Sequence, residues 1–463
     1  MLRNVPLFGV GNKALSVKVS AQERTNLYVE VQEDPEANGL VLYPTPGVST
    51  FVNFGANPIR GLYERGDVIY AVVSSTLWEI AANGTTTNRG TLNTSGGRVD
   101  MADNGLQMLI VDGTDGYILT FATNVFAEIA DADFVPGDTC AFLNGRFLVS
   151  QSSSGRFGWS ALYDGTAWDA LDFATAESHP DELERVFVDG AVAHMLGAST
   201  VEQWADSGAE DQPVARIGAG AMQWGLAARW SVAKGQEGFF CLGKSRLGGV
   251  QVYVVSGASY KAVSTPQVEQ EWARYSAVEN ATAYSYMANG RSFYQINFPT
   301  ADKSWLWDGT AWNRVESAGG RHRGEIQINF QNRSYVSDYE NGKLYLLDAD
   351  TYTDDGEPIV REVVTRHSKS GDFIRLSKLW VEMEAGVGLN AGQGSDPQIM
   401  LQISRDGGQT WGNEMWRSIG RIGEYVARAV WNRLGRARDF VFRLRITDPV
   451  KSVFVAGWAQ YDQ

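Results

Sequence analysis

Cysteine is scarce in this sequence, with Cys140 and Cys241 the only two among 463 residues. Two thiols so far apart cannot supply the disulfide framework of a small secreted domain, so we expect both to be small buried hydrophobic residues. The chain also lacks an apolar signal-peptide core at its start, and no run approaches the roughly 18 apolar residues of a membrane-spanning helix. These absences predict a soluble protein that is made in the cytoplasm.

Recognisable catalytic and metal-binding motifs are missing as well. The four histidines are dispersed, with no HExxH and no zinc-finger spacing; they are His179, His194, His322 and His367. There is no GxSxG elbow and no Walker loop. The glycine pattern from Gly9 to Ala14 resembles a dinucleotide fingerprint, but it follows no expected strand and opens no helix. We therefore expect no enzyme, no catalytic residue and no cofactor.

The acidic stretch from Asp348 to Gly356 is the best candidate for a metal site in this sequence. An EF-hand loop would need a ligand and a glycine where this chain has Tyr352 and Thr353. A solvated loop without a bound metal is therefore the better interpretation.

Basic residues are outnumbered by acidic ones, and the chain carries a net charge of −14. The net charge differs between the two parts of the chain. From Glu357 to Gln463 there are 15 Lys and Arg against 12 Asp and Glu, a net +3, whereas residues 1–356 carry 25 against 42, a net −17. Affinity for nucleic acid comes mainly from clustered Lys and Arg, so the composition argues against a general nucleic-acid binder. It also indicates that body and tail meet different partners or surfaces.

Glycine and aromatic residues, in contrast, are plentiful. Fifty glycines make about 11% of the chain, against a usual value of roughly 7%. Trp, Tyr and Phe together make another 11%. Glycine supplies tight turns, and aromatic side chains favour the half-buried surface of a strand. The composition thus predicts an all-β protein with many short strands.

A repeating pattern of strand, glycine-containing turn, strand and polar loop runs from Ile59 to Asp350. Its units begin near Ile59, Gly97, Thr139, Glu184, Leu226, Thr282 and Glu325. A spacing of about 42 residues is typical of propeller blades, each of which must stack on its neighbours to bury its faces. We predict a β-propeller of six or seven blades over residues 59–356. Stacked β-sandwiches are the alternative.

The segments around this repeat differ from it. Residues 1–58 contain five prolines, among them Pro35, Pro44, Pro46 and Pro58, and are expected to be an extended segment that docks on neighbouring domains. Residues 357–463 alternate like sandwich strands and predict a separate C-terminal β-sandwich-like domain. Inside the repeat, the pattern of residues 266–277 predicts one helix, with Thr265 as its N-cap and Pro266 in its first turn.

One local pattern looks like the Asp-box hairpin of sialidases and other propellers. It consists of Ser404, Asp406, Gly408, Thr410 and Trp411. In such a hairpin the Asp accepts backbone N–H groups within a tight turn and the Trp packs beneath it. Shorter relatives begin at Asp164 and Asp308. These boxes indicate a structural role and not a catalytic one.

A basic segment with interleaved tryptophans follows the box. From Arg417 to Lys451 there are nine basic residues against three acidic ones. Arg and Trp are typical of interface anchors, and a solvated basic strand face is the equally weighted alternative. The candidate assembly interface comprises Trp416, Arg417, Arg421, Arg428, Trp431, Arg433, Arg436 and Arg438.

Several stretches together resemble a known family of viral proteins. These are residues 174–181, 197–204 and 213–217 within the run from Trp168 to Gly225, the helix at 266–277, and the closing stretch from Asp406 to Pro449. They are similar to the packaged-DNA stabilisation proteins that form the tail hub, or nozzle, of short-tailed bacteriophages. The likeness is one of order and pattern, and it covers most of the chain after about residue 40.

The resemblance implies a structural protein of the virion, assembled in the host cytoplasm. Its copies, commonly six, would form a ring that continues the DNA channel below the portal and its adaptor, retains packaged DNA and supports ejection. Implied partners are the adaptor, tailspikes or tail fibres, a needle or plug protein, and duplex DNA passing without sequence-specific binding. The C-terminal domain would serve ring assembly and docking.

Two other classes of function stay open on the sequence alone. The first is a monomeric propeller that binds glycans or proteins. The second is a sialidase-like glycoside hydrolase, which would need a Tyr nucleophile with an acidic partner and a cluster of arginines, none of which spacing can assign here.

Overall fold

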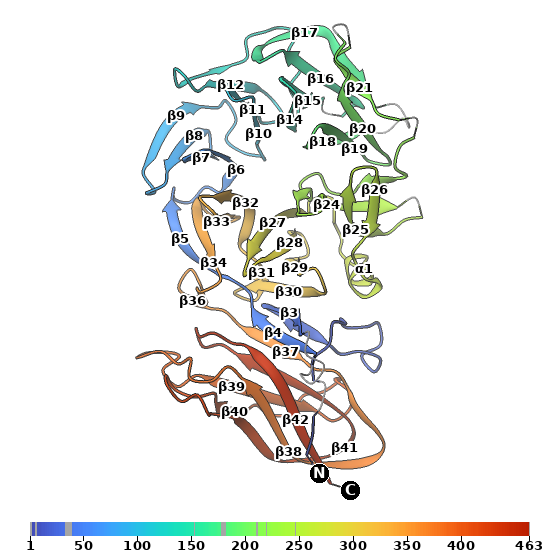
Figure 1. Ribbon diagram of the computed structural model, residues 1–463, viewed down its shortest axis with the longest axis vertical. Helices are drawn as coiled ribbons and strands as arrows, with labels where there is room; N and C mark the ends of the chain where they lie inside the picture. The colour runs from blue at the N-terminus through green and yellow to red at the C-terminus, as the bar shows by residue number, and fades with distance from the viewer. Residues whose placement is uncertain are drawn as a thin grey trace.

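The computed structural model describes residues 2–462 except 5–6, 33–38, 152, 177–181, 210–211, 219 and 246. A ring of small sheets stands above an elongated sandwich of long strands (Figure 1). The described residues contain a single α-helix, α1 (Pro266–Trp272). The predicted all-β class, a propeller with an additional C-terminal β-sandwich, is confirmed.

Six blades are each built from one contiguous stretch of chain, with neighbouring strands antiparallel. The first two are β6 (Ile59–Arg65), β7 (Val68–Val73), β8 (Thr76–Ala81) and β9 (Thr86–Thr91), then β10 (Asp100–Asp103), β11 (Gln107–Val111), β12 (Gly116–Thr120) and β13 (Val125–Glu128). The next two are β14 (Cys140–Leu143), β15 (Arg146–Ser150), β16 (Arg156–Ala161) and β17 (Asp164–Thr175), then β18 (Leu183–Asp189), β19 (Val192–Gly197), β20 (Val201–Asp206) and β21 (Val214–Arg216). The last two are β22 (Trp224–Leu226), β23 (Ala233–Lys234), β24 (Phe239–Ser245), β25 (Val250–Ser256) and β26 (Ser259–Ala262), then β27 (Thr282–Ala288), β28 (Arg291–Phe298), β29 (Lys303–Trp307) and β30 (Trp312–Ser317), with β31 (Gly320–Arg321) beside β30.

A seventh blade closes the ring by joining two distant parts of the chain. Its strands are β32 (Gly324–Phe330), β33 (Arg333–Asp338), β34 (Lys343–Asp348) and the N-terminal β5 (Gly47–Asn53), with β35 (Thr353–Asp354) and β36 (Glu357–Pro358) at its edge. It contacts the first blade through β32 and β6. Each of the seven expected units begins within three residues of an innermost strand.

The core of the propeller lies between blades, in seven hydrophobic clusters that each join two neighbouring blades. Strand β11 shows how one strand serves two clusters. Met108 and Ile110 point toward the first blade, whereas Leu109 and Val111 point toward the third. Successive side chains of a strand face opposite sides, so a blade that is buried on both faces needs a continuous apolar run.

The sandwich combines strands from both ends of the chain. Its strands are β1 (Leu2–Asn4), β3 (Leu27–Val31), β4 (Leu40–Pro44), β37 (Arg361–Val364), β38 (Ser368–Met383), β39 (Gln398–Ser404), β40 (Met415–Ser418), β41 (Ala429–Ile446) and β42 (Phe454–Asp462). Strand β41 belongs to both sheets, because its first half pairs with β38 and its second half with β37 and β39. One large apolar cluster fills the space between the sheets.

The N-terminal part is more structured than the expected extended segment at 1–58. Strand β5 completes a propeller blade, and β3 and β4 extend the sandwich. At the junction of the propeller and the sandwich, β2 (Glu23–Thr25) pairs with both β30 and β37. One continuous sheet therefore runs from the sixth blade into the sandwich. Pro46 and Pro58 lie in the breaks on either side of β5, whose pairing partner β34 lies near the other end of the propeller sequence.

The helix is shorter than predicted, since α1 ends at Trp272. Thr265 occupies the N-cap position with extended backbone, but its hydroxyl caps no N–H group. Val268 and Trp272 are buried against the sixth blade, where the Trp272 ring lies 5.3 Å from that of Trp312. Packing of these two side chains holds the helix in place, since seven residues are too few for a stable isolated helix.

Candidate assembly surfaces

The predicted interface is spread along β40 and β41 and does not form one patch. Ala429, next to Arg428, pairs with Val381, whereas Ala437, next to Arg438, pairs with Ile374, so the two arginines lie toward opposite ends of the β38–β41 pairing. The segment therefore contributes to two separate surfaces of the sandwich.

The first surface is an apolar loop patch formed by Leu389, Ile422, Tyr425 and Val426. All four are exposed, Tyr425 to 77% and Val426 to 92%. The two loops that carry them touch, since the Gly423 N–H donates to the Gly386 carbonyl and Tyr425 covers Gly386. Exposed apolar side chains gathered in this way are a feature of interaction sites.

Four of the predicted interface residues lie on or near these loops. Trp416 on β40 is 52% exposed. Arg417 donates to the carbonyls of Val430 and Trp416, which fixes its side chain along the sheet. Arg421 lies 3.6 Å from Asp396, and the Arg428 guanidinium lies 5.2 Å from the Trp380 ring centroid. These contacts order the side chains and leave Trp416 available.

The second surface, the arginine end, comprises Phe373, Arg375, Arg433, Arg436 and Arg438. Arg375 on β38 stands directly opposite Arg436 on β41, and it also pairs with Asp462 of β42 in backbone register. The surface therefore lies at the end of the sandwich farthest from the propeller, where β42 ends (Figure 1). The guanidiniums of Arg436 and Arg438 lie over the exposed Phe373 ring at 5.4 and 4.6 Å.

The arginines of the arginine end form no short-range ion pair within the described part of the chain, although Asp462 stands opposite Arg375 in register. No carboxylate of the described residues lies within 4.0 Å of a charged nitrogen in any of its four arginines. Like charges directly opposite each other on neighbouring strands destabilise a sheet. An acidic partner would relieve that repulsion.

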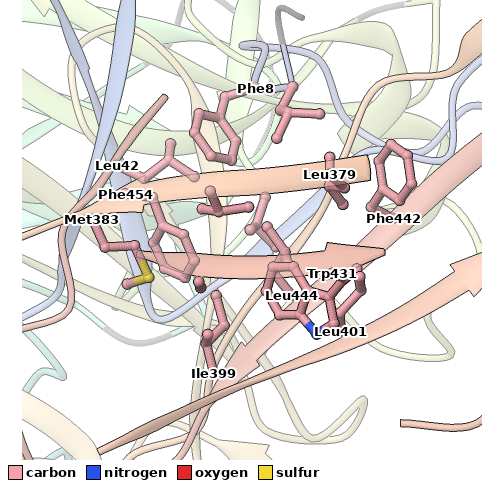
Figure 2. Close-up of a cluster of buried hydrophobic side chains, with 14 of the residues drawn as sticks. Phe8, Leu42, Leu379, Met383, Ile399, Leu401, Trp431, Phe442, Leu444 and Phe454 are labelled. Carbon is pink, nitrogen blue, oxygen red and sulfur yellow. The ribbon is translucent and has the colours of Figure 1, made fainter. Parts of the chain in front are cut away.

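The assignment of Trp431 to the interface is wrong. Its side chain is 0% exposed and belongs to the sandwich core (Figure 2). The indole N–H donates to the Met415 carbonyl at 2.9 Å, which satisfies its one polar group. Strand alternation explains the error, because Trp431 faces inward between the partly exposed Val430 and the exposed Asn432.

The Asp-box residues form a hydrogen-bonded turn between β39 and β40. The Asp406 carboxylate accepts the N–H groups of Gln409 and Thr410 and the hydroxyls of Ser404 and Thr410, the latter two at 2.6 Å. These bonds, the one from the Ser404 hydroxyl most of all, hold the pKa of Asp406 well below its usual range. Gly408 has φ +90°, a conformation that favours glycine.

Trp411 closes the box from the side of the sandwich. It packs beside Val17 and Val441, and the Arg443 guanidinium lies 4.0 Å from its ring centroid. The turn lies in the sandwich and not in a blade. Its hydrogen bonds brace the β39–β40 hairpin.

The cysteines and the described histidines are buried or hydrogen-bonded to neighbouring groups of the fold. Cys140 and Cys241 are buried, and burial raises the pKa of each thiol. Burial lowers the pKa of His194 to about 4. His322 accepts from the Gly324 N–H, His367 bonds Asp439, and His179 lies outside the described residues, as do residues 177–181 of the expected family stretch.

Two loops singled out from the sequence have other contacts. In the acidic loop, Asp354 pairs with Arg323 at 2.7 Å and Asp355 with Lys343 at 2.5 Å. In the glycine-rich N-terminal stretch, the carbonyls of Gly9 and Gly11 accept from Arg24. Over the described parts of the chain, no group of three His, Cys, Asp or Glu side chains is placed to hold a metal ion. In those same parts, no helix has the length and apolar character to cross a membrane.

Comparisons with known proteins identify a family that has both a propeller and a sandwich. A family model described as bacteriophage P22 Gp10, beta-propeller, matches residues 3–352, and a second, described as bacteriophage P22 Gp10, beta-sandwich, matches residues 352–461. The chain belongs to the bacteriophage P22 Gp10 family. The expected kinship with the tail hub proteins of short-tailed phages is confirmed, and the protein is a structural component of the phage tail.

Other comparisons add less. No curated protein matches the chain in sequence. Among solved structures, the N-terminal domain of Nup159 shares 10% identity with a TM-score of 0.40, covering 70% of this chain and 98% of its own. YCF48 from Cyanidioschyzon merolae shares 11% identity with a TM-score of 0.42, covering 65% of this chain and 98% of its own. At these values no property is transferred from either.

Sequence reasoning missed the apolar loop patch. Ile422, Tyr425 and Val426 stand in a loop that contains Gly420 and Gly423, and an exposed apolar cluster in a glycine-containing loop is a usable signal. The predicted interface contained only Trp and Arg residues and therefore left these side chains out.

Proposed function

We propose that copies of this chain, six in the expected ring, continue the DNA channel below the portal and its adaptor, retain packaged DNA and support its ejection. Assembly of the tail would take place in the host cytoplasm. The observation that carries the proposal is the match to both Gp10 models along nearly the whole chain. A closed ring needs two different surfaces on each copy, and the sandwich presents one apolar surface and one basic surface.

The two surfaces suit different partners. The apolar loop patch suits a neighbouring copy, because the cores of protein interfaces are depleted in charge and enriched in aromatic residues. The arginine end suits an acidic face of the adaptor, since electrostatic complementarity guides docking. Tailspikes or tail fibres and a needle or plug protein would occupy further surfaces of the assembled ring.

Electron microscopy of the purified chain, alone and mixed with its adaptor, tests ring formation. We expect a symmetric ring with a channel wide enough for duplex DNA. Replacing Ile422, Tyr425 and Val426 by Ser should prevent ring formation while the monomer stays folded, whereas Leu171→Ser, at an equally exposed apolar position on the propeller, should not. Isolated propellers in every sample would contradict the proposal and favour a monomeric binding protein.

Phage assembly tests the arginine end. Replacing Arg433, Arg436 and Arg438 by Glu should give heads that package DNA and then leak it. A matched control is Arg156→Glu, since Arg156 is also exposed and lies 4.6 Å from the Phe173 ring centroid, but on the propeller. Stable full heads from the triple variant would contradict the docking role.

The acidic body suits the wall of a DNA channel. A negative wall repels phosphate, so duplex DNA slides past without sequence-specific binding. Glu64, Asp67 and Asp169 are exposed carboxylates of the propeller. Reversing such residues to Lys should slow genome ejection, and unchanged ejection kinetics would argue against the channel-lining role.

A further inference from the structure

The centre of the propeller contains a cavity of about 290 Å³. Its walls come from six of the seven blades, through the innermost strands β6, β10, β18, β23, β27 and β32, and from Trp230. Strands that are far apart in the sequence thus line one site on the propeller axis. The volume lies just below the range for pockets of drug-sized ligands, about 300–1,000 Å³, which suits a small ligand.

Basic side chains gather at this cavity, although the body around it is acidic. The lining contains Arg98, Arg185 and Lys234 but one carboxylate, Asp100, whereas residues 1–356 carry a net −17. Lys234 is 66% exposed, so it marks the side on which the cavity meets solvent, and there it pairs with Asp189 at 3.2 Å. A cluster of basic groups within an acidic domain is a local feature that average composition does not explain.

The two arginines are only partly compensated by carboxylates. Arg185 Nη2 lies 3.6 Å from Asp100 Oδ1, and Arg98 Nη1 lies 3.9 Å from Glu325 Oε1. Both distances exceed the 2.7–2.9 Å of a charge-assisted hydrogen bond. Each carboxylate also has a second partner, since Asp100 accepts from the Cys140 N–H at 3.1 Å and Glu325 accepts from Arg321 at 2.9 Å.

Polar groups around the cavity are left without partners. The buried Nε of Arg185 makes no hydrogen bond, nor does the buried hydroxyl of Ser285. A buried donor without an acceptor costs about 1–3 kcal/mol. Such groups, next to a cavity, are ready to bind an acceptor.

Trp230 holds the two guanidiniums in place. They lie 5.0 and 4.9 Å from its ring centroid, for Arg98 and Arg185 respectively. The Trp230 carbonyl accepts from the Ala283 N–H at 2.8 Å, which anchors the residue to the sixth blade. Burial, together with repulsion from Arg185, lowers the pKa of Arg98 to about 10. A bound anion would relieve that repulsion.

We propose that this axial cavity binds a small oxyanion, a phosphate or a carboxylate, through Arg98 and Arg185, with Lys234 at its mouth. The planar guanidinium presents paired donors that match both kinds of anion. The site is separate from the assembly surfaces of the sandwich, so its occupancy does not depend on the proposed hub function. Ligand bound there would bridge six blades and stiffen the propeller.

Calorimetric titration of the full-length chain with inorganic phosphate, and separately with citrate, tests the proposal at constant ionic strength set by sodium chloride. We expect saturable binding of at least one of the two and a parallel change in tryptophan fluorescence that is lost in Trp230→Phe. Arg98→Gln and Arg185→Gln should each weaken binding at least tenfold, and Arg98→Lys should weaken it less. Saturation by phosphate alone or by citrate alone supports the site and identifies the ligand chemistry.

Two further variants separate binding from folding. Lys234→Gln removes an exposed charge and its surface pair with Asp189, so it should weaken binding two- to threefold with a nearly unchanged melting temperature. Arg89→Gln, which breaks the partly exposed pair with Glu79 on the first blade, should leave binding unchanged. Absence of saturable binding for both anions, or equal binding by the wild type and the Arg98 and Arg185 variants, would overturn the proposal.

Discussion

The propeller and the sandwich of this chain are built from the sequence in opposite ways. In the propeller, six blades each use one contiguous stretch, and hydrogen-bonded strands follow each other directly. In the sandwich, neighbours come from opposite ends of the chain, as where Leu42 of β4 faces Phe454 of β42. Regular local repetition can therefore be read from a sequence, whereas a sheet assembled from distant strands has no local signature.

The two regions also differ in what their surfaces offer. The propeller is acidic but has three basic side chains lining its axial cavity, and the sandwich has a basic end and an apolar loop patch. In the propeller, arginines near carboxylates stabilise the fold. In the sandwich, four arginines without carboxylate partners among the described residues point to a surface that is completed by another molecule.

The largest expected effect separates core from surface within the sandwich. Trp431→Ala should lower the free energy of unfolding by about 3–5 kcal/mol, because a fully buried indole leaves a cavity. Trp416→Ala, at an exposed position on the neighbouring strand, should change it by less than about 0.5 kcal/mol. Urea denaturation of both variants measures the difference. Equal losses would mean that the two tryptophans are not distinguished by burial.

The junction between the two regions should be the next most sensitive point. Arg24 is buried and donates to Asn313 Oδ1 at 2.6 Å and to the carbonyls of Gly9, Gly11 and Trp312. Arg24→Met leaves these acceptors unsatisfied and should cost about 2–3 kcal/mol. Scanning calorimetry should then show the sandwich and the propeller unfolding at more widely separated temperatures.

A partly exposed ion pair provides the control for Arg24. Arg89→Met removes the two hydrogen bonds to Glu79, which water can partly replace, so it should cost less than Arg24→Met, on the order of 1 kcal/mol. A loss for Arg24→Met no greater than that of Arg89→Met would show that the junction is not held by the buried guanidinium.

The propeller should have a pH dependence that comes from His194. Burial lowers its folded pKa to about 4, while the unfolded value is near 6.5, so the unfolded state binds more protons between these values. Stability from this residue is present above about pH 6.5 and is lost as the pH falls toward 4. At pH 5 the loss should be about 2 kcal/mol.

Comparison with His194→Phe isolates this effect from other titrating groups. The stability difference between wild type and variant should shift in favour of the variant by about 2 kcal/mol between pH 7.5 and 5. A constant difference over that range would show that His194 does not titrate on unfolding.

The smallest expected effect concerns the arginine end. Arg436→Glu places an opposite charge across from Arg375 and should stabilise the isolated chain by about 0.2–1 kcal/mol. A stabilising substitution that harms partner docking would show that this surface is maintained for binding. Loss of stability in the isolated chain would contradict the cross-strand repulsion.

The sequence by itself determined the repeat and its approximate limits. Glycine turns and apolar strands at about 42-residue spacing predicted the blades, because each blade is local in sequence and must bury both faces. The Asp-box turn could also be predicted from the sequence, because the hydrogen bonds among Ser404, Asp406 and Thr410 join residues that lie within a few positions of one another. Interactions of short range leave short-range patterns.

Only the tertiary structure decided how the ends of the chain join and which side chains reach the surface. Strand β5 closes the ring with β34 nearly 300 residues away, and Trp431 turns inward beside exposed arginines of the same strand. Arg98 and Arg185 meet at the propeller axis although 87 positions separate them. Such pairings depend on the closure of the ring and on which face of a strand meets the core, and both are set by packing of the whole chain.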